Sequence, residues 1–523
     1  MLKVRINVVI LICCVNILSV ETEKILGVFS MPSISHQVVF RKLTQELAKR
    51  GHDLTVITTD PAYPQGEAPA NYKEIDVHDV SYQTLAKSFQ SDYKVDQEVP
   101  TFSDIKQGSL MLPHIFEAQL QVPEVAELIA RDKDTFDLIL IEAVMHPALA
   151  FSYVFNAPVI FVSSMGAFFN NYDIVGSPSH PFLYPSFIHR KIYDLNVWEK
   201  LNVLYFHYSY KFAVYLNEDY ENKLLQKYFG PNIPPLSELY NNVHMLFINL
   251  SPVWADNQPV PPNVVYMGGI HQLPQKELPK DLNAFLDSSK KGVIYLSFGT
   301  NILPQMIPSD KIDIMVKVLS NLPYDVLWKW NLDELPGKGD NIKIAKWYPQ
   351  PDLLRHPKVI LFITQAGLQS TDEAITAGVP LVALPMLGDQ WYNAEKYVKH
   401  GIGVKIDIKY LNEDYFRSAI ETVIGNESYK ENVTKLRDYV RDQPQSPLER
   451  AIWWSEYVIR NKGAQQLKPR GANISSYEYF EIELLLIILL VIVLLILISI
   501  TIAKVAFKCV LNMIRSKSKL KVT

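Results

Sequence analysis

The chain has 523 residues, too many for one ordinary hydrophobic core, so we expect two domains with accessory segments. Its 51 Lys and Arg residues against 55 Asp and Glu residues leave a formal net charge of -4, and the basic residues of the body are dispersed. This balance argues against a nucleic-acid partner.

Residues 1–20 have the layout of a cleaved secretory signal. Lys3 and Arg5 precede an apolar run over residues 6–18, and small or polar residues follow before Glu21. We therefore expect the mature chain to begin near residue 21, inside the secretory pathway.

The three cysteines lie only at the two ends of the chain. Cys13 and Cys14 belong to the predicted signal, and Cys509 lies close to the C-terminus. The domains between them cannot use disulfides or thiolate metal sites, so their cores must be stable without these crosslinks.

The first half alternates short apolar strands with amphipathic helices, which predicts a doubly wound α/β domain over residues 21–260. Apolar residues recur at helical spacing over residues 36–51, and Gly51 suits a helix C-terminus. The expected strands are 24–31, 53–59, 136–143 and 157–164.

A Pro- and Lys-rich stretch, residues 261–291, interrupts this alternation and is predicted to be an interdomain linker. The alternation then restarts, which predicts a second doubly wound domain over residues 292–440. Its expected strands are 292–300, 324–330, 341–347, 359–367 and 379–385, and its expected helices are 308–321, 369–377 and 390–399.

One segment of the first half is rich in aromatic residues. It runs from Phe168 into residues 196–216. Aromatic residues at helical spacing usually belong to a core, which is the favoured interpretation. If some of them line a cleft instead, the ligand of that cleft is apolar.

The C-terminal end predicts a membrane anchor. After a helical and juxtamembrane segment, 441–483, residues 484–503 contain no charge, and a helix of that length spans roughly 30 Å, the thickness of a bilayer core. Residues 504–523 are basic, which places this tail in the cytosol and the domains in the lumen. The last five residues, 519–523, resemble a lysine-based retrieval signal for the endoplasmic reticulum; a merely basic tail is the alternative.

Four Asn-x-Ser/Thr sequences occur in the expected luminal part. Asn426, Asn432 and Asn473 are predicted to be accessible to glycosylation. Asn249 lies within an apolar run and is predicted to be buried.

The second domain contains the most specific motif. The strand 359–367 ends in Gln365, Ala366 and Gly367, and the helix that follows presents free N–H groups, a pattern that predicts a phosphate site at a helix N-terminus. Glu373 lies one turn into that helix, where it could accept hydrogen bonds from ribose hydroxyls. Trp347 offers a flat face for a base, and the pair at 389–390 offers polar groups for a sugar.

Together, in this order and spacing, these residues resemble the signature of the UDP-glycosyltransferase family, and the resemblance extends from His36 to the basic tail. It implies a GT-B fold, in which two Rossmann-like domains face each other across a cleft. By motif position, Trp347 and Gln350 are expected at the uridine and Glu373 at the ribose. The remaining expected donor contacts are Thr300, Gln365, Gly367, Gln369 and Ser370 around the diphosphate, and Asp389 and Gln390 at the sugar.

Two positions depart from many relatives. The vertebrate glucuronosyltransferases have His where Gln365 stands and Asn where Gln369 stands. Gln donates a neutral hydrogen bond and carries no charge, so the site resembles that of arthropod glucosyltransferases. The resemblance therefore favours UDP-glucose as donor and a small lipophilic acceptor.

Two residues of the first domain are expected to carry the catalysis. His36 follows the first strand, and its context resembles that of the family's catalytic histidine. Glu142 ends a strand at the position of the family's catalytic Asp, which orients the histidine as a triad carboxylate does. Glutamate is longer by one methylene, which changes the geometry that must bring the two together.

No metal or other cofactor is expected besides the UDP-sugar co-substrate. The Asp132 and Asp134 pair precedes a strand and is interpreted as a solvated turn. The resemblance implies that helix dipole and hydrogen bonds stabilise the leaving UDP. The competing interpretations are a UDP-sugar-binding membrane protein that has lost catalysis and a single-pass adhesion or receptor protein. Homo-oligomerisation stays possible.

Overall fold

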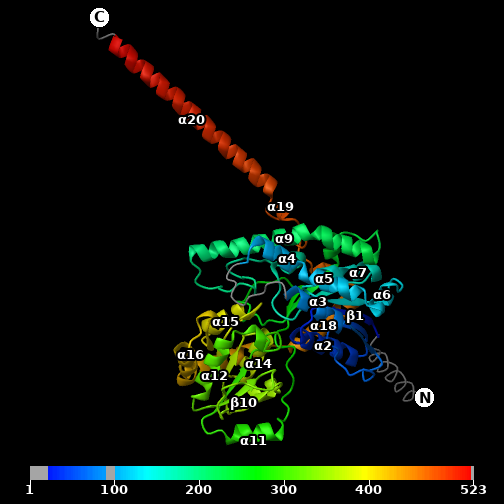
Figure 1. The fold of residues 1–523 in the computed structure, drawn as a ribbon. Helices are drawn as coiled ribbons and strands as arrows, with labels where there is room; N and C mark the ends of the chain where they lie inside the picture. Colours follow the sequence, from blue (N-terminus) through cyan, green and yellow to red (C-terminus); the bar gives the residue numbers. More distant parts are fainter. Residues whose placement is uncertain (1–21, 90–99, 520–523) are drawn as a thin grey trace, which may run out of the picture. The chain divides into compact units, whose positions relative to one another are not determined.

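The computed structural model describes residues 22–89 and 100–519 and divides into two compact units at Arg470. The first unit contains two parallel β-sheets, each covered by helices (Figure 1). The predicted signal, residues 1–20, and residues 520–523 of the predicted retrieval sequence lie outside the described residues.

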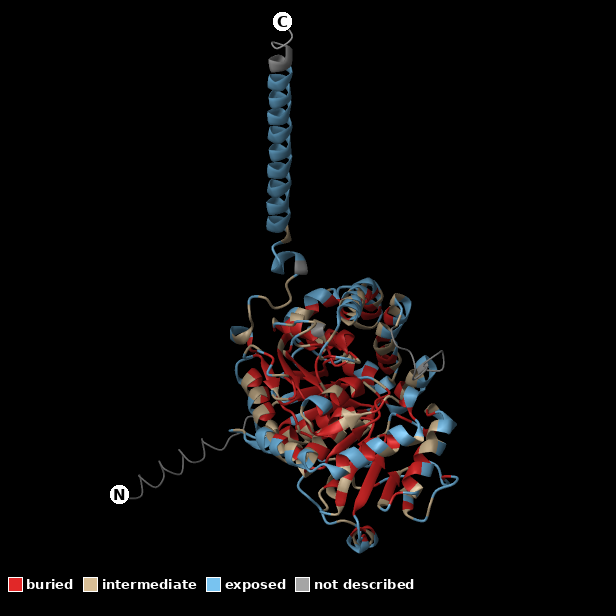
Figure 2. Cartoon of the chain, turned by 90° about the vertical axis from the view of Figure 1, so that its left-hand side faces the viewer, coloured by how far each residue is buried: buried red, intermediate tan, exposed pale blue. Residues whose placement is uncertain are grey.

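The first sheet has seven parallel strands in the order β3-β2-β1-β4-β5-β6-β7. Buried parallel strands need apolar side chains on both faces, and every residue of β4 and β5 is buried accordingly (Figure 2). The strands are β1 (Lys24–Phe29), β2 (Asp53–Thr58), β3 (Tyr72–Asp76), β4 (Leu138–Glu142), β5 (Val159–Ser163), β6 (Val243–Ile248) and β7 (Val264–Tyr266).

The second sheet has six parallel strands in the order β10-β9-β8-β11-β12-β13. This is the same winding as in the first sheet: the chain starts in the middle, proceeds to one edge and then returns to build the other side. The strands are β8 (Val293–Ser297), β9 (Asp325–Lys329), β10 (Ile342–Ala345), β11 (Val359–Thr364), β12 (Leu381–Ala383) and β13 (Gly403–Lys405). Every strand predicted from the sequence is present.

The helices of the first half pack around the first sheet. In α2 the apolar residues Val39, Phe40, Leu43 and Leu47 share the buried face, as their spacing predicts. The helices are α2 (Ile34–Lys49), α3 (His78–Phe89), α4 (Phe102–Ser109), α5 (Met111–Leu120), α6 (Pro123–Ile129), α7 (Ala150–Phe155), α8 (Phe169–Val175), α9 (Val197–Phe229) and α10 (Leu236–Leu239).

The helices of the second half include the three that the sequence predicts, which are α12, α14 and α15. They are α11 (Lys280–Ser288), α12 (Ser309–Ser320), α13 (Gln350–Leu354), α14 (Leu368–Ala377), α15 (Gln390–Lys399), α16 (Glu413–Gly425), α17 (Ser428–Arg441) and α18 (Pro447–Arg460).

The predicted boundary of the first domain, residue 260, is too early. β7 lies within residues 261–291, the expected linker, and pairs in parallel with β6. The three-residue strand has too short an apolar pattern to stand out beside the prolines around it. Helix α18, in the segment 441–483, also returns to the first domain, where Ile452 and Val458 join the core formed by α2 and the first sheet.

The aromatic-rich segment forms most of α9, and core is the wrong description for much of it. Tyr208 and Tyr215 are 63% and 69% exposed, whereas Phe206 and Tyr210 line a cavity. Only a few α9 side chains are buried because the helix crosses the outside of the domain, so its two faces have different surroundings.

The second unit contains α19 (Ser476–Tyr479) and α20 (Ile482–Lys519). By length and composition, Ile482–Arg515 is apolar enough to cross a membrane, and it includes the predicted span 484–503. Its apolar side chains are exposed along the helix (Figure 2), as those of a lipid-facing helix would be.

The Asn-x-Ser/Thr sequences differ in accessibility. Asn426 is exposed and Asn473 is half-buried. Asn249 is fully buried and its amide donates to the Ser164 carbonyl, as its burial predicts. Asn432 is less accessible than expected, because its Nδ2, the atom that glycosylation would modify, donates to the Gly401 carbonyl at 3.0 Å.

Candidate active site

In both sheets the site residues come from the point where the strand order reverses. β1 and β4 are neighbours in the first sheet, and β8 and β11 are neighbours in the second. Parallel neighbours end at the same edge, so loops that are distant in sequence meet there. This topology brings His36 close to Glu142, and Thr300 close to Gln365.

His36 and Glu142 form a buried pair. The Nδ1 atom of His36 lies 2.7 Å from Oε1 of Glu142, and Oε2 of the same carboxylate accepts a hydrogen bond from the Met31 backbone N–H at 2.9 Å. His36 is 8% exposed and Glu142 1%. The extra methylene of glutamate therefore does not prevent the contact. Because Nδ1 faces the carboxylate, Nε2 remains available to accept a proton.

A cleft of about 490 Å³ lies between the two sheets and contains His36 in its lining. Glu142 lies behind His36 and does not line it. Every donor residue predicted from the sequence does: Thr300, Trp347, Gln350, Gln365, Gly367, Gln369, Ser370, Glu373, Asp389 and Gln390.

A hydrogen-bond network organises one end of the cleft around Gln350. The Oε1 atom of Gln350 accepts from the Tyr295 hydroxyl at 3.0 Å. Its Nε2 donates to Ser370 Oγ at 2.9 Å and to Glu373 Oε2 at 2.7 Å. Gln350 therefore holds two other predicted contacts in place, while Trp347, beside it, is 66% exposed and presents a free ring.

The carboxyl group of Glu373 has an unusually high pKa. Desolvation by burial raises its pKa to about 7, although the hydrogen bond from Gln350 acts in the opposite direction. A carboxyl group in this state can both donate to and accept from hydroxyl groups, which matches a vicinal diol such as that of a ribose.

The turn between β11 and α14 approaches the loop after β8 closely. Gly299 has a φ of +69°, and a Cβ at this glycine would lie 2.2 Å from Nε2 of Gln365. The left-handed conformation favours glycine at this position, and a larger side chain would also displace the amide of Gln365. Within the turn, Ala366 takes the left-handed conformation, with a φ of 68°, and Gly367 is extended.

Helix α14 begins at Leu368 with Gly367 as its N-cap and without a capping side chain. The Leu368 N–H donates to Asp389 Oδ2 at 3.3 Å, and the N–H groups that follow it, those of Gln369 and Ser370, can receive an anion from the cleft. The amide of Gln369 has another partner, because its Nε2 donates to the Ser164 carbonyl in the first domain at 2.9 Å. Thr300 is half-buried at the cleft wall, and its hydroxyl donates to the adjacent Asn301 at 3.4 Å.

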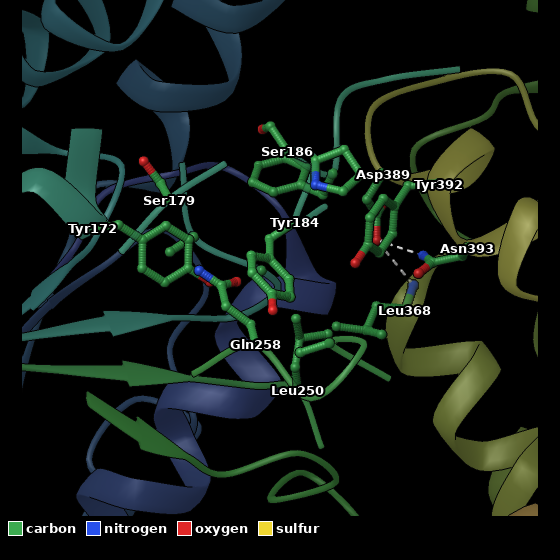
Figure 3. Close-up of a pocket in the computed structure, with 15 residues that line it drawn as sticks. Tyr172, Ser179, Tyr184, Ser186, Leu250, Gln258, Leu368, Asp389, Tyr392 and Asn393 are labelled. Carbon is green, nitrogen blue, oxygen red and sulfur yellow. Dashed lines mark hydrogen bonds between the residues drawn. The ribbon is translucent and has the colours of Figure 1, made fainter. Parts of the chain in front are cut away.

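Asp389 lies between the cleft and a smaller cavity of about 30 Å³, shown in Figure 3. Its Oδ2 accepts from Asn393 Nδ2 at 2.8 Å and from the Leu368 N–H at 3.3 Å. Burial raises the pKa of Asp389, whereas the Asn393 hydrogen bond lowers it. Gln390 is buried, and its Oε1 accepts from two backbone N–H groups, those of Met386 and Leu387. Only its amide nitrogen is left for a ligand.

The sequence interpretation missed Lys329, which ends β9 at the same sheet edge. Its Nζ donates to the Gly299 carbonyl at 2.5 Å and lies 5.1 Å from the centroid of the Trp347 ring. Burial lowers the pKa of this amine. Lys329 lies at the carboxyl end of the predicted strand 324–330. Because β9 neighbours β8, this position could have indicated a site residue.

A second cavity, of about 330 Å³, lies in the first domain and was also missed. Its walls come from α4, α5, the loops after β4 and β5, and α9. We call it the first-domain cavity. Val144, which lines it, is two residues beyond Glu142 in the sequence.

Among residues 22–89 and 100–519, no three His, Cys, Asp or Glu side chains gather in a group that could hold a metal ion. Asp132 and Asp134 lie in an exposed turn before β4.

The family model described as UDP-glucoronosyl and UDP-glucosyl transferase matches residues 24–519. The chain belongs to this family of UDP-glycosyltransferases. As a member of the family, the enzyme transfers a sugar from a UDP-sugar donor.

Similar proteins include glycosyltransferases of insects and insect viruses. The glycosyltransferase is 35% identical to the ecdysteroid UDP-glucosyltransferase of Spodoptera littoralis nuclear polyhedrosis virus, over 92% of this chain and 96% of the relative. It is 31% identical to UDP-glucosyltransferase 2 of Dactylopius coccus, over 88% of this chain and 89% of the relative.

Solved structures confirm the GT-B fold predicted for the glycosyltransferase. The glycosyltransferase VinC in complex with dTDP superimposes with a TM-score of 0.58 at 15% identity, covering 84% of this chain and 100% of VinC. Arabidopsis thaliana UGT89C1 complexed with UDP-L-rhamnose gives a TM-score of 0.56 at 15% identity, covering 85% of this chain and 100% of that protein.

Proposed function

We propose that this enzyme moves glucose from UDP-glucose to a hydroxyl group of a small lipophilic acceptor, with inversion at the anomeric carbon. The observation that carries the proposal is the buried His36–Glu142 pair, which opens onto a cleft whose opposite wall carries the complete donor motif. Relatives named as UDP-glucosyltransferases support glucose as the sugar.

In the proposed reaction, His36 is the general base and Glu142 is its orienting carboxylate. The acceptor oxygen attacks the anomeric carbon, the bond from that carbon to the β-phosphate oxygen breaks, and UDP leaves with the electron pair. The acceptor proton passes to Nε2 of His36, while Nδ1–H stays bonded to Glu142. The imidazolium that forms is stabilised by the adjacent carboxylate.

The donor residues divide by the part of UDP-glucose that each would contact. Trp347 would stack on the uracil, and Glu373, held by Gln350, would bind the ribose hydroxyls. The diphosphate would lie at the N-terminus of α14, beside Gln365, Ser370 and Thr300. Asp389 and the Gln390 amide would bind the sugar hydroxyls.

The first-domain cavity is the proposed acceptor site. Its walls are predominantly apolar, with Ile105, Phe168 and Phe206 among them. The volume of about 330 Å³ is at the lower end of the roughly 300–1,000 Å³ typical of small-molecule sites. Met165 lines the cleft and Phe168 lines the cavity, and both pack against the same small apolar cluster.

The full-length protein in microsomes, compared with microsomes that lack it, provides the test. UDP-glucose, UDP-glucuronate and UDP-N-acetylglucosamine are each offered with phenolic and steroid alcohol acceptors, and products are identified by mass spectrometry. We expect glucosides to dominate. A preference for glucuronate would contradict the donor assignment. UDP binding without any transfer would favour the alternative of a catalytically impaired UDP-sugar-binding membrane protein.

We also propose a single-pass type I topology in the endoplasmic reticulum, with α20 as the anchor and both sheets in the lumen. The apolar length of Ile482–Arg515 and the basic residues that follow the span support it. Protease added to intact microsomes should then remove only a small C-terminal tail, and Lys519→Ser with Lys521→Ser should let the enzyme reach later compartments. Protease access to the domains, or unchanged residence of the double variant, would contradict the corresponding assignment.

A further inference from the structure

One face of α9 lines the first-domain cavity, and its side chains change from apolar to polar along the helix. Phe206, Tyr210, Val214, Asn217 and Glu221 all line it. Their spacings of three and four residues place them on a single helix face. Along this face, apolar side chains at the N-terminal end change to an amide and a carboxyl group at the C-terminal end, so the cavity is apolar over most of its length and polar at one end.

The amide of Asn217 has a structural explanation. Its Nδ2 donates to the Lys106 carbonyl at 3.1 Å and to Ser109 Oγ at 2.7 Å, which holds α9 against α4. Stacking of Phe102 on Phe212, with ring centroids 5.7 Å apart, strengthens the same contact.

The carboxyl group of Glu221 has no such explanation. Glu221 is only 8% exposed, yet its carboxyl group makes no hydrogen bond or ion pair within the described part of the chain. A buried polar group without a partner costs free energy, so its presence needs a reason. Because the carboxyl group lines the cavity, a molecule in the cavity can supply the missing partner.

The surroundings of Glu221 favour its neutral form. Desolvation by burial, followed by the negative charge of Glu218, raises its pKa to about 8. His146 lines the same cavity, but burial lowers its pKa to about 4, so at neutral pH it carries no charge that could pair with the carboxyl group. A protonated carboxyl group has one O–H donor and also accepts, the same capacity as a hydroxyl group.

We propose that Glu221 is a specificity-determining residue that binds a second hydroxyl group of the acceptor, distant from the one that is glycosylated. The inference rests on the proposed acceptor site in the first-domain cavity. It narrows the acceptor class to rigid apolar molecules with at least two hydroxyl groups, in which an apolar body lies along Phe206 and Tyr210.

A neutral hydroxyl group fits this site better than a charged one. A carboxylate on the acceptor would have to be desolvated beside Glu221 and Glu218. An amine would convert the site to a buried ion pair, whose desolvation penalty can exceed the attraction gained. A hydroxyl group brings no charge into the cavity, so no charged group has to be desolvated.

The experiment compares rigid steroid diols, each with hydroxyl groups at opposite ends, with the mono-ols that lack the distal hydroxyl. The kcat/KM for glucosylation is measured with full-length enzyme in microsomes for the parent, Glu221→Leu, Glu221→Gln and Asp219→Asn. Asp219 lies on the same helix, is exposed and pairs with Lys223, so its variant is the matched control for loss of one carboxyl group.

We expect the parent and Asp219→Asn to prefer the diol by about 10- to 100-fold, the range for a buried hydrogen-bonding group left unpaired by the mono-ol. Glu221→Leu should lose this preference, mainly through KM. Glu221→Gln should retain most of it, because an amide also donates and accepts.

An unchanged diol preference in Glu221→Leu would overturn the inference, as would a stronger response to amino-alcohols than to diols. These results are distinct from failure of the proposed function, which would appear as absence of transfer to every acceptor by the parent enzyme. Binding of the diol, measured by its quenching of tryptophan fluorescence in the detergent-solubilised full chain, separates loss of recognition from loss of turnover. Unaltered diol affinity in Glu221→Leu would also count against the assignment.

Discussion

The interdomain cleft and the first-domain cavity are built in different ways. The donor wall of the cleft comes from loops at one edge of the second sheet, between Tyr295 and Gln390, with its main chain and side chains tied together by hydrogen bonds. The first-domain cavity is assembled from five separate segments between Pro100 and Glu221, with mostly apolar walls. A nucleotide-sugar has many polar groups to match, which demands fixed positions, whereas an apolar body requires only a space of suitable shape.

The difference also concerns where the polar groups of each space find their partners. In the cleft, Glu373 and Asp389 accept hydrogen bonds from neighbouring side chains, so the donor wall is organised before a ligand arrives. In the cavity, Glu221 has no such partner among the described residues. The cleft wall is therefore preorganised, whereas the proposed acceptor site would depend on its ligand to complete one interaction.

His36 and Glu142 are the proposed catalytic pair, and their loss should have the largest effect. His36→Ala should lower kcat by roughly 10²–10⁴-fold, the usual contribution of general-base catalysis, with UDP affinity unchanged. Glu142→Gln should also lower kcat, and the double variant should be little worse than His36→Ala because the two act as a unit. Steady-state kinetics with UDP-glucose and calorimetry with UDP provide the two measurements. Multiplicative losses would show that Glu142 acts elsewhere.

Asp389→Ala should separate the sugar from the nucleotide within the cleft. We expect a loss in kcat/KM of about 10- to 100-fold, since hydrogen bonds to a charged group typically contribute about 1.5–3 kcal/mol. UDP affinity should stay within a few-fold. Asp389→Asn is the control, because an amide oxygen can still accept from the Leu368 N–H at the start of α14. Equal loss of UDP binding and of transfer would contradict the division of the donor site.

Trp347→Ala should weaken UDP itself, by about 10-fold, because aromatic stacking contributes about 0.5–1.5 kcal/mol beyond the area buried. Trp347→Phe, which keeps an aromatic face, should lose less. Lys329 lies near the ring, so the response of UDP affinity to salt in the two variants shows how far the cation contributes. Wild-type UDP affinity in Trp347→Ala would place the uracil elsewhere in the cleft.

The smallest expected effect tests the unpartnered carboxyl group of the cavity. The pKa of Glu221 is about 8 in the folded enzyme and about 4.5 as its ordinary value, so the folded state holds the extra proton between these pH values. The stability that this group contributes is therefore present below about pH 4.5 and is lost as pH rises toward 8. Glu221→Gln does not titrate, and its melting temperature should exceed that of the parent by more at pH 8 than at pH 5.

A change of about 1 kcal/mol in the free energy of unfolding shifts the melting temperature of a domain of this size by roughly 2–4 °C, which a thermal melt resolves. The titratable groups that face Glu221 or share its cavity are Glu218, Tyr210, Tyr240, His146 and Asp104. Burial lowers the pKa of His146 to about 4 and raises the pKa values of Tyr210 and Tyr240, so none of these three titrates between pH 5 and 8. Asp219→Asn should show no such dependence on pH. A pH-independent difference between Glu221→Gln and the parent would show that Glu221 is already ionised.

The two regions also differed in how far they could be predicted. Trp347, Glu373 and Asp389 stand in one stretch of chain, and the loops that carry them follow strands whose apolar runs are easily read. The first-domain cavity could not be predicted, because Phe206 and Glu221 of α9 line the same space as Ile105 of α4 and Leu112 of α5 only through the packing of these helices. The same reason explains β7, whose three residues have a partner in β6 but no periodicity of their own.

The sequence by itself determined nine of the strands, the apolar span within α20 and the family signature, because each of these depends on residues close together in the chain. Only the tertiary structure decided which side chains have their partners. It joined Glu142 to His36 across more than a hundred positions, bonded Gln369 to the first domain, and left Glu221 facing an apolar cavity. Pairing and desolvation depend on what surrounds a group in space, and for these residues the surroundings come from distant segments of the chain.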